Sequence, residues 1–169
     1  DIIKLLDFLV NKNKKHFTLT VQGIGNEDYV KHIKQLAKAC DVLKHIDFND
    51  TYTCPTKSHR FYEQIDVFLV TSKHEGGPIT ALEAAAAGRM LLSYNVGAMP
   101  DRFSQFPYIV NSTFDALCTA ALNFCNLSQH EKLGLVQNIK NHYNTALSNT
   151  TKGTQLLKIF EDVPHTDKN

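Results

Sequence analysis

Two glutamates and a pair of glycines surround the start of a predicted helix. Glu75 is followed by Gly76 and Gly77, and Glu83 comes eight residues after Glu75. Glu83 is the one charged residue of the helix predicted over residues 79–87. An ionised carboxylate at the edge of a buried face is costly unless solvent, a cation or the hydroxyl groups of a ligand compensate it. The sequence leaves these three possibilities open for Glu83.

The start of the same helix offers backbone groups to an anion. Pro78 stands where helices tend to begin. The free N–H groups of a first helical turn favour negative charge by roughly 0.3–1 kcal/mol, or about 2 kcal/mol when partly buried. The carboxylates suit a ligand rich in hydroxyl groups, and the helix end suits a phosphate. A nucleotide sugar carries both kinds of group.

A strand, loop, helix and second strand position these residues. Residues 67–70 and 90–94 are short apolar runs of the kind that lie buried in a parallel sheet. Ile79, Leu82 and Ala86 have the i, i+3, i+7 spacing that predicts the helix face packed on the sheet. A strand that opens at its carboxyl end into a glycine loop and a helix is typical of the binding crevice of an open α/β sheet.

Residues 72–88 resemble the signature of the family 4 retaining glycosyltransferases of the GT-B fold. That signature is S-x-x-E-G, then a second Glu eight positions after the first, then A-x-A-x-G. Residues 95–101 are similar to the G-G-x-P-E loop that follows it, with Ala98 in place of the second Gly and Asp101 in place of the Glu. The resemblance covers most of the chain, from about residue 5 to residue 124.

The resemblance implies a fold and a set of site residues. The fold is a Rossmann-like three-layer α/β domain with a parallel sheet, the C-terminal half of a GT-B glycosyltransferase. Glu83 is implied to accept hydrogen bonds from the nucleotide ribose, and Glu75, as the catalytic residue, to hold or polarise the transferred sugar. Backbone N–H groups that hold the sugar or diphosphate are implied near Gly76, Gly77, Ile79 and Thr80.

The implied reaction moves a sugar from a nucleotide-diphosphate donor to a saccharide or lipid-linked acceptor and keeps the anomeric configuration. The donor's own phosphate is expected to take the acceptor proton, and no divalent metal is expected. Two alternatives stay open: a nucleotide-sugar epimerase of the related two-domain fold, and a non-catalytic nucleotide-sugar-binding domain. The presence of both Glu75 and Glu83 argues against a loss of chemistry.

Length and composition suit one globular domain. The chain has 169 residues, of which 43% are hydrophobic and 21% charged. We expect the domain to occupy residues 1–163 and to be followed by a loose tail over 164–169. The formal net charge of +1 argues against a nucleic-acid partner. Four cysteines are too few for a disulfide scaffold, so we expect a cytoplasmic protein, with peripheral membrane association at the inner face in its full-length form.

The first residue, Asp1, has no preceding Met, and the sequence opens on a predicted helix. We therefore expect a fragment of a longer two-domain enzyme. The resemblance implies an Arg and a Lys upstream that neutralise the diphosphate, and an acceptor site mostly on an N-terminal domain. On this basis the 169 residues alone should bind a nucleotide weakly and transfer nothing.

Predicted strands alternate with predicted helices along the chain, a pattern typical of βαβ units and a parallel sheet. The remaining strands are predicted over residues 17–22, within 42–48 and over 108–110. The remaining helices are predicted over residues 2–10, 28–40, 57–64, 113–126, 128–147 and 152–160.

Gly23 and Gly25 follow the predicted strand over residues 17–22. The third glycine of a dinucleotide-binding fingerprint would fall at Asp28, so that motif fails. Two readings remain open: a tight turn from strand to helix, or, from the resemblance, part of the lining of the donor crevice.

Several further residues have a functional and a plain structural interpretation. The Cys and His residues at 40, 45, 54 and 59 form a set that zinc accepts, but Cys40 falls on an apolar helix stripe, which favours buried thiols and surface histidines. His74 is either an acid–base group or an exposed loop residue. Arg89 either reaches the donor phosphates or is solvated, and Tyr52 could cover the nucleotide base.

Overall fold

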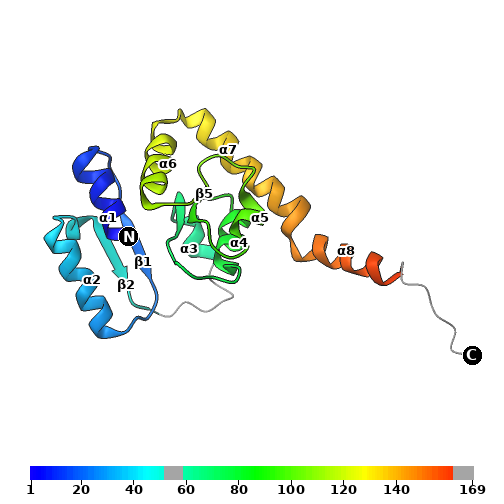
Figure 1. The fold of residues 1–169 in the computed structure, drawn as a ribbon, viewed down its shortest axis with the longest axis horizontal. Coiled ribbons are helices and arrows are strands. Elements are labelled where there is room, and N and C mark those ends of the chain that lie inside the picture. Colours follow the sequence, from blue (N-terminus) through cyan, green and yellow to red (C-terminus); the bar gives the residue numbers. More distant parts are fainter. Residues whose placement is uncertain (52–58, 162–169) are drawn as a thin grey trace, which may run out of the picture.

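A computed structural model describes residues 1–51 and 59–161 and shows an α/β protein with two parallel sheets (Figure 1). The first sheet pairs β1 with β2, and the second has the order β3-β4-β5. The strands are β1 (Leu19–Gln22), β2 (Ile46–Asn49), β3 (Val67–Val70), β4 (Met90–Tyr94) and β5 (Val110–Asn111).

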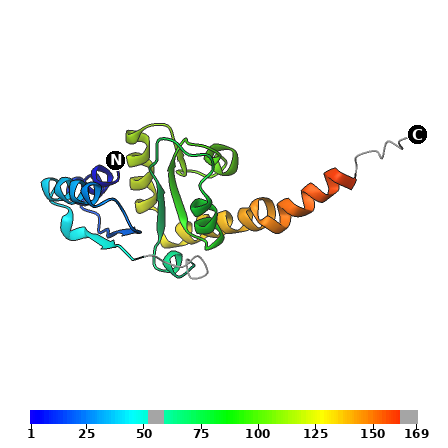
Figure 2. The same cartoon turned by 90° about the horizontal axis from the view of Figure 1, so that it is seen from below.

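Helices connect and cover the strands (Figure 1). They are α1 (Ile2–Asp7) with its π-helical continuation η1 (Phe8–Lys12), α2 (Glu27–Ala39), the 3₁₀ turn η2 (Leu43–His45), α3 (His59–Glu63), α4 (Ile79–Ala86), α5 (Met99–Phe103), α6 (Phe114–Asn126), α7 (Gln129–His142) with the π-helical η4 (Tyr143–Leu147), and α8 (Asn149–Glu161). Figures 1 and 2 both show α8 extending away from the body of the molecule. Over the described residues, no helix combines the length and the apolar character needed to cross a membrane.

Side chains at three helix starts explain where those helices begin. Asn26 accepts hydrogen bonds from the first turn of α2, and the Thr113 hydroxyl accepts one from the N–H of Ala116 at the start of α6. Ser128 and Glu131 form a complete capping box at the start of α7. The predicted Thr and Ser caps of α6 and α7 are therefore confirmed.

Strand β4 is the centre of the larger sheet and of the main core. Met90, Leu91, Leu92 and Ser93 are all buried, because β4 has a neighbour on each side and helices around it. Asn111 on β5 is the other buried polar residue among those described, and its amide donates to the backbone carbonyl of Ser93 at 3.2 Å. The apolar run of β4 thus satisfies the expectation of a buried parallel strand.

The predicted packing face of α4 is wrong. Ile79 is 71% exposed, whereas Ala81, Ala84 and Ala85 are fully buried. Helix α4 packs against β3, β4 and α7, and alanines allow it to approach them closely. The large side chain of Ile79 is left outside this contact, at the start of the helix.

Smaller differences concern the ends of the chain's elements. The predicted helix over residues 2–10 is present, but Ile3 is fully buried and Ile2 only in part. Helix α5 was not predicted from the sequence. The last strand lies at Val110–Asn111 rather than over 108–110.

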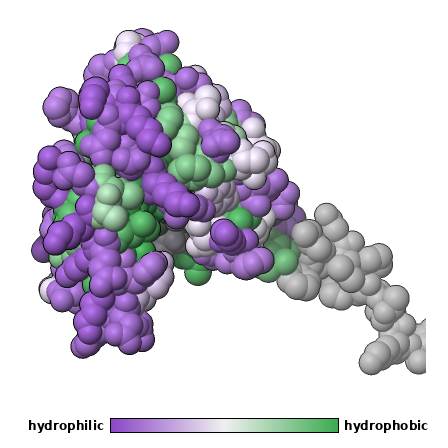
Figure 3. Space-filling view, turned by 60° about the vertical axis from the view of Figure 1, so that its left-hand side comes forward, coloured by the Kyte–Doolittle hydropathy of each residue, from purple (hydrophilic) through white to green (hydrophobic). Residues whose placement is uncertain are grey.

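The elements from α1 to β2 form a group beside the larger sheet (Figure 1). Two hydrogen bonds between side chains join this group to the rest: Lys15 Nζ donates to Asn126 Oδ1 at 2.7 Å, and the Tyr94 hydroxyl donates to Asp1 Oδ2 at 3.0 Å. Figure 3 shows apolar surface between hydrophilic regions on this side of the molecule. The two sheets share no ladder hydrogen bond in the described part of the chain.

Candidate functional site

Two loops meet at the carboxyl ends of neighbouring strands. The loop over residues 71–78 follows β3, and the loop over residues 95–98 follows β4. The N–H of Ala98 donates to the carbonyl of Gly76 at 3.0 Å and joins them. Ligands of open α/β sheets bind at this edge of the sheet, so the predicted site residues lie where the topology places a binding crevice.

Gly97 makes this close approach of the loops possible. Its φ is +50°, and a Cβ built on it would lie 2.5 Å from the carbonyl oxygens of both Glu75 and Gly76. No side chain fits there, and the left-handed backbone conformation independently favours glycine. The similarity of residues 95–101 to a glycine loop therefore has a physical basis at Gly97.

Arg102 lies beneath the glycine loop and was not predicted as a site residue. A Cβ on Gly77 would lie 3.2 Å from its Nη2 and 3.3 Å from its Nη1. Nη1 is buried and makes no hydrogen bond with any described residue. The guanidinium thus places a positive charge with an unused donor next to the loop. No sequence signal marked it, because the contact depends on the unpredicted helix α5.

Glu83 accepts a hydrogen bond from a buried tyrosine. The hydroxyl of Tyr62 on α3 donates to Glu83 Oε2 at 2.6 Å. Tyr62 is 4% exposed, and its burial, followed by the hydrogen bond to Glu83 and the charge of that carboxylate, raises the pKa of its hydroxyl. Glu83 itself is exposed, so its carboxylate retains capacity for further hydrogen bonds. Solvent and a protein hydroxyl, rather than a cation, stabilise this charge.

The first turn of α4 is free of protein side-chain caps. Its N-cap residue is Pro78, and no side chain accepts from its N–H groups. Ile79, Thr80 and Glu75 are exposed, and the Glu75 carboxylate has no partner among the described residues. Backbone donors and a free carboxylate therefore border the same open surface, and Glu83 lies one turn into the helix.

Gly23 and Gly25 lie at the end of β1, in the other sheet. Gly23 has φ +130° and donates its N–H to the carbonyl of Asn49 at 2.9 Å. A Cβ on Gly25 would lie 3.0 Å from Val30 Cγ2. These constraints account for a tight turn into α2. Their participation in donor binding stays a prediction.

The other candidates have varied surroundings. Cys40 is partly exposed, and no group of three metal-ligating side chains occurs within residues 1–51 and 59–161. Tyr52 and Cys54 lie outside the described residues. His74 is exposed, whereas Arg89 is partly buried and its Nε has no hydrogen-bond partner among the described residues.

A cavity of about 490 Å³ lies away from these loops. It is lined by residues of α1, β1 and β3, and neither Glu75 nor Glu83 lines it. The glycine-loop site is an open surface at the carboxyl edge. We assign the candidate site by its chemistry, because the cavity carries only His16 and Asp66 as side chains that titrate near neutral or acidic pH.

Comparison with known proteins identifies the family. A profile of the family Glycosyl transferases group 1 matches residues 1–113. No curated protein sequence matches the chain.

Solved structures share the fold at low sequence identity. The C-terminal domain of a group 1 glycosyl transferase, LpcC, from Francisella tularensis has a TM-score of 0.74 and 20% identity, over 88% of this chain and 78% of that one. TarM of S. aureus, in complex with Fondaparinux, alpha-GlcNAc-glycerol and UDP, has a TM-score of 0.73 and 16% identity, over 94% of this chain and 32% of that one. Anabaena HepE, in complex with UDP-glucose, has a TM-score of 0.70 and 15% identity, over 94% and 44%.

The chain spans less than half the length of sucrose-phosphate synthase from Thermosynechococcus elongatus, of which it covers 42%. The profile match extends over more than half of the chain, and the structural matches agree with it. This chain belongs to the group 1 glycosyl transferase family and has the Rossmann-like fold of a GT-B C-terminal domain.

Proposed function

We propose that this chain is the donor-binding domain of a retaining glycosyltransferase that uses a nucleotide-diphosphate sugar. The observation that carries the proposal is the junction of the two loops through Ala98 and Gly76, which places the uncapped start of α4 beside Glu75 and Arg102. Hydroxyl acceptors, backbone donors and a positive charge are thereby gathered at one edge of the sheet. A sugar nucleotide presents the complementary groups.

Each part of the site has a proposed role. Glu83 accepts hydrogen bonds from the ribose with the acceptor capacity that Tyr62 leaves, and Glu75 orients the transferred sugar. The N–H groups near Gly76 and Gly77, and those of the first turn of α4, hold the diphosphate or sugar. These groups position the donor and stabilise the charge that develops on its phosphate.

The resemblance adds the reaction class to this proposal. The sugar passes to a saccharide or lipid-linked acceptor with retention, and the donor phosphate accepts the proton of the attacking hydroxyl. The scheme uses no divalent metal, so EDTA should leave donor binding unchanged. Acceptor binding is assigned to another domain of the full-length protein.

Thermal unfolding in the presence of UDP, GDP and ADP sugars tests the proposal and identifies the base. At a concentration ten times the dissociation constant, a ligand stabilises the folded state by about 1.4 kcal/mol. For a chain of 169 residues this corresponds to an increase in Tm of roughly 3–6 °C. Free sugars and inorganic pyrophosphate serve as controls for partial ligands.

An increase with one class of nucleotide sugar supports the proposal. No increase with any of them, at concentrations up to tens of millimolar, would contradict it. Release of a free isomerised sugar by the full-length protein without an acceptor would instead identify an epimerase.

A further inference from the structure

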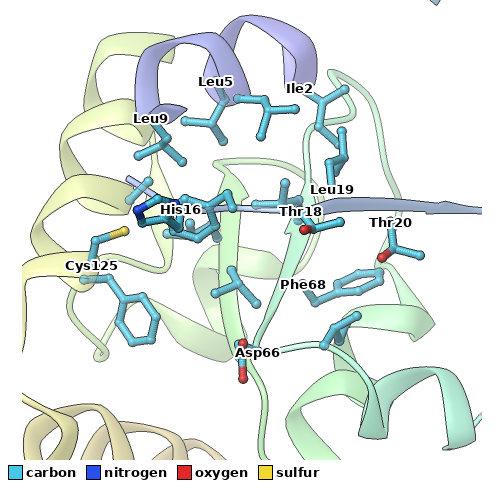
Figure 4. A pocket seen from close by; sticks show the side chains of 18 of the residues that line it. Ile2, Leu5, Leu9, His16, Thr18, Leu19, Thr20, Asp66, Phe68 and Cys125 are labelled. Atoms are coloured by element: carbon cyan, nitrogen blue, oxygen red, sulfur yellow. The ribbon is translucent and has the colours of Figure 1, made fainter. Parts of the chain in front are cut away.

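The cavity of about 490 Å³ separates the two sheets, and Figure 4 shows it from close by. Phe17, Thr18, Leu19 and Thr20 line one side, and the residues from Asp66 to Leu69 line the other. The beginnings of β1 and β3 therefore face each other across an apolar crevice. In the part of the chain that the structure describes, β1 pairs only with β2, and β3 pairs only with β4.

The printed backbone bonds show which peptide groups face the crevice. In a parallel ladder, the N–H and C=O of one residue point to the same neighbouring strand, and those of the next residue point the other way. Gly23 donates to Asn49 of β2, so the peptide group of Thr20 points away from β2. Asp66 accepts from Met90 of β4, so those of Val67 and Leu69 point away from β4.

The crevice thus has polar backbone edges and apolar side-chain walls. Leu5 and Leu9 reach into it from α1 and η1, and Phe124 comes from α6 (Figure 4). Unpaired backbone groups in apolar surroundings are unfavourable. An extended peptide supplies both the missing hydrogen bonds and apolar side chains, whereas a small apolar ligand supplies only the second.

The direction of the chain around the crevice identifies the peptide. Asp1 accepts from Tyr94 at the carboxyl end of β4, so α1 begins at that edge. Lys15, just before β1, donates to Asn126 at the end of α6, so the segment from α1 to β1 returns to the amino edge. This is the path of a crossover helix between two neighbouring parallel strands, the second of which is β1.

We propose that polypeptide preceding Asp1 forms an extended strand in this crevice, parallel to β1 and β3, and that it joins the two sheets into one. The resulting order, β2-β1-new strand-β3-β4-β5, is that of a doubly wound sheet. Helices α1 and α6 already cover one side of it. The carboxyl ends of β1 and β3 would then lie at one continuous edge, with Gly23 two strands away from the glycine loop.

Amide hydrogen exchange of three versions of the protein tests the proposal. The first is the 169-residue chain, and the second carries five alternating valines and isoleucines joined to Asp1 by a short Asn/Gly linker. The third is a matched control in which prolines replace alternate residues of this extension, since proline cannot donate to a ladder. The probes are Thr20, Val67 and Leu69, and the internal references are Val21 and Phe68, whose peptide groups face existing partners.

In the 169-residue chain and the proline control, the three probe amides should exchange faster than the two references. The valine extension should slow exchange of the probes by roughly ten-fold or more and leave the references little changed. Sedimentation should show monomers. Equal probe exchange in the valine and proline versions would overturn the proposal, as would probe protection that disappears on dilution, which would identify a second copy of the chain as the occupant.

Discussion

Replacing Gly97 with alanine tests the packing on which the site depends. The new Cβ would lie 2.5 Å from two carbonyl oxygens, at a φ of +50°. A left-handed conformation costs a non-glycine residue about 1–2 kcal/mol. If the loops separate to relieve the contact, the hydrogen bond between Ala98 and Gly76 is lost, at about 0.5–1.5 kcal/mol. We therefore expect Gly97→Ala to lower the free energy of unfolding by about 2–3 kcal/mol.

Urea unfolding measures this change, and Gly76→Ala is the matched control in the same pair of loops. A Cβ on Gly76 has no atom within 4 Å, so its effect on stability should be small. Gly97→Ala should also weaken nucleotide-sugar binding, because it displaces the backbone groups of Glu75 and Gly76. If the two variants unfold at the same urea concentration, the inferred role of Gly97 is refuted.

Three further substitutions probe other parts of the fold. Tyr62→Phe removes the 2.6 Å bond to Glu83 and should cost about 1 kcal/mol, since the acceptor is exposed. Because the folded-state pKa of Tyr62 is raised, its contribution is complete below the ordinary tyrosine pKa of about 10 and falls at higher pH; urea unfolding between pH 7 and 11 should show the difference between wild type and variant shrinking above pH 10, and a constant difference would contradict this. Ser128→Ala removes the cap of α7 and should lower stability by about 1 kcal/mol in chemical denaturation, whereas no change would show that the capping box is dispensable. Gly134→Ala, in an open position within α7, should raise Tm through a gain of roughly 0.5–1 kcal/mol, and a lower Tm would reveal a contact missing from this account.

The central strand–loop–helix–strand unit was predictable because its signals are local. The apolar runs of β3 and β4, the glycines after β3 and the stop at Gly88 each mark a boundary within a few residues. Gly88 has φ +68°, as a helix stop requires. The existence and order of these elements therefore followed from the sequence.

The contacts that complete the site depend on residues distant in the sequence. Tyr62 reaches Glu83 from another helix, and Arg102 reaches Gly77 from α5. The apolar spacing of α4 favoured Ile79 as a core residue, because periodicity does not show how closely alanines allow a helix to pack. The separation of the two sheets also has no local signal, since strand pairing is set by tertiary structure.

The affinity of Glu83 variants for a nucleotide sugar tests the central claim most directly. Titration calorimetry should use wild type, Glu83→Gln, Glu83→Asp and, as an exposed control on α3, Glu63→Gln. Loss of one charge-assisted hydrogen bond of about 1.5–3 kcal/mol predicts a roughly 10- to 150-fold weaker affinity for the Gln variant, a clear loss for the shorter Asp, and no change for the control. All four proteins should keep the same circular dichroism spectrum. Wild-type affinity in a folded Glu83→Gln protein would contradict the assignment of Glu83 to the donor site.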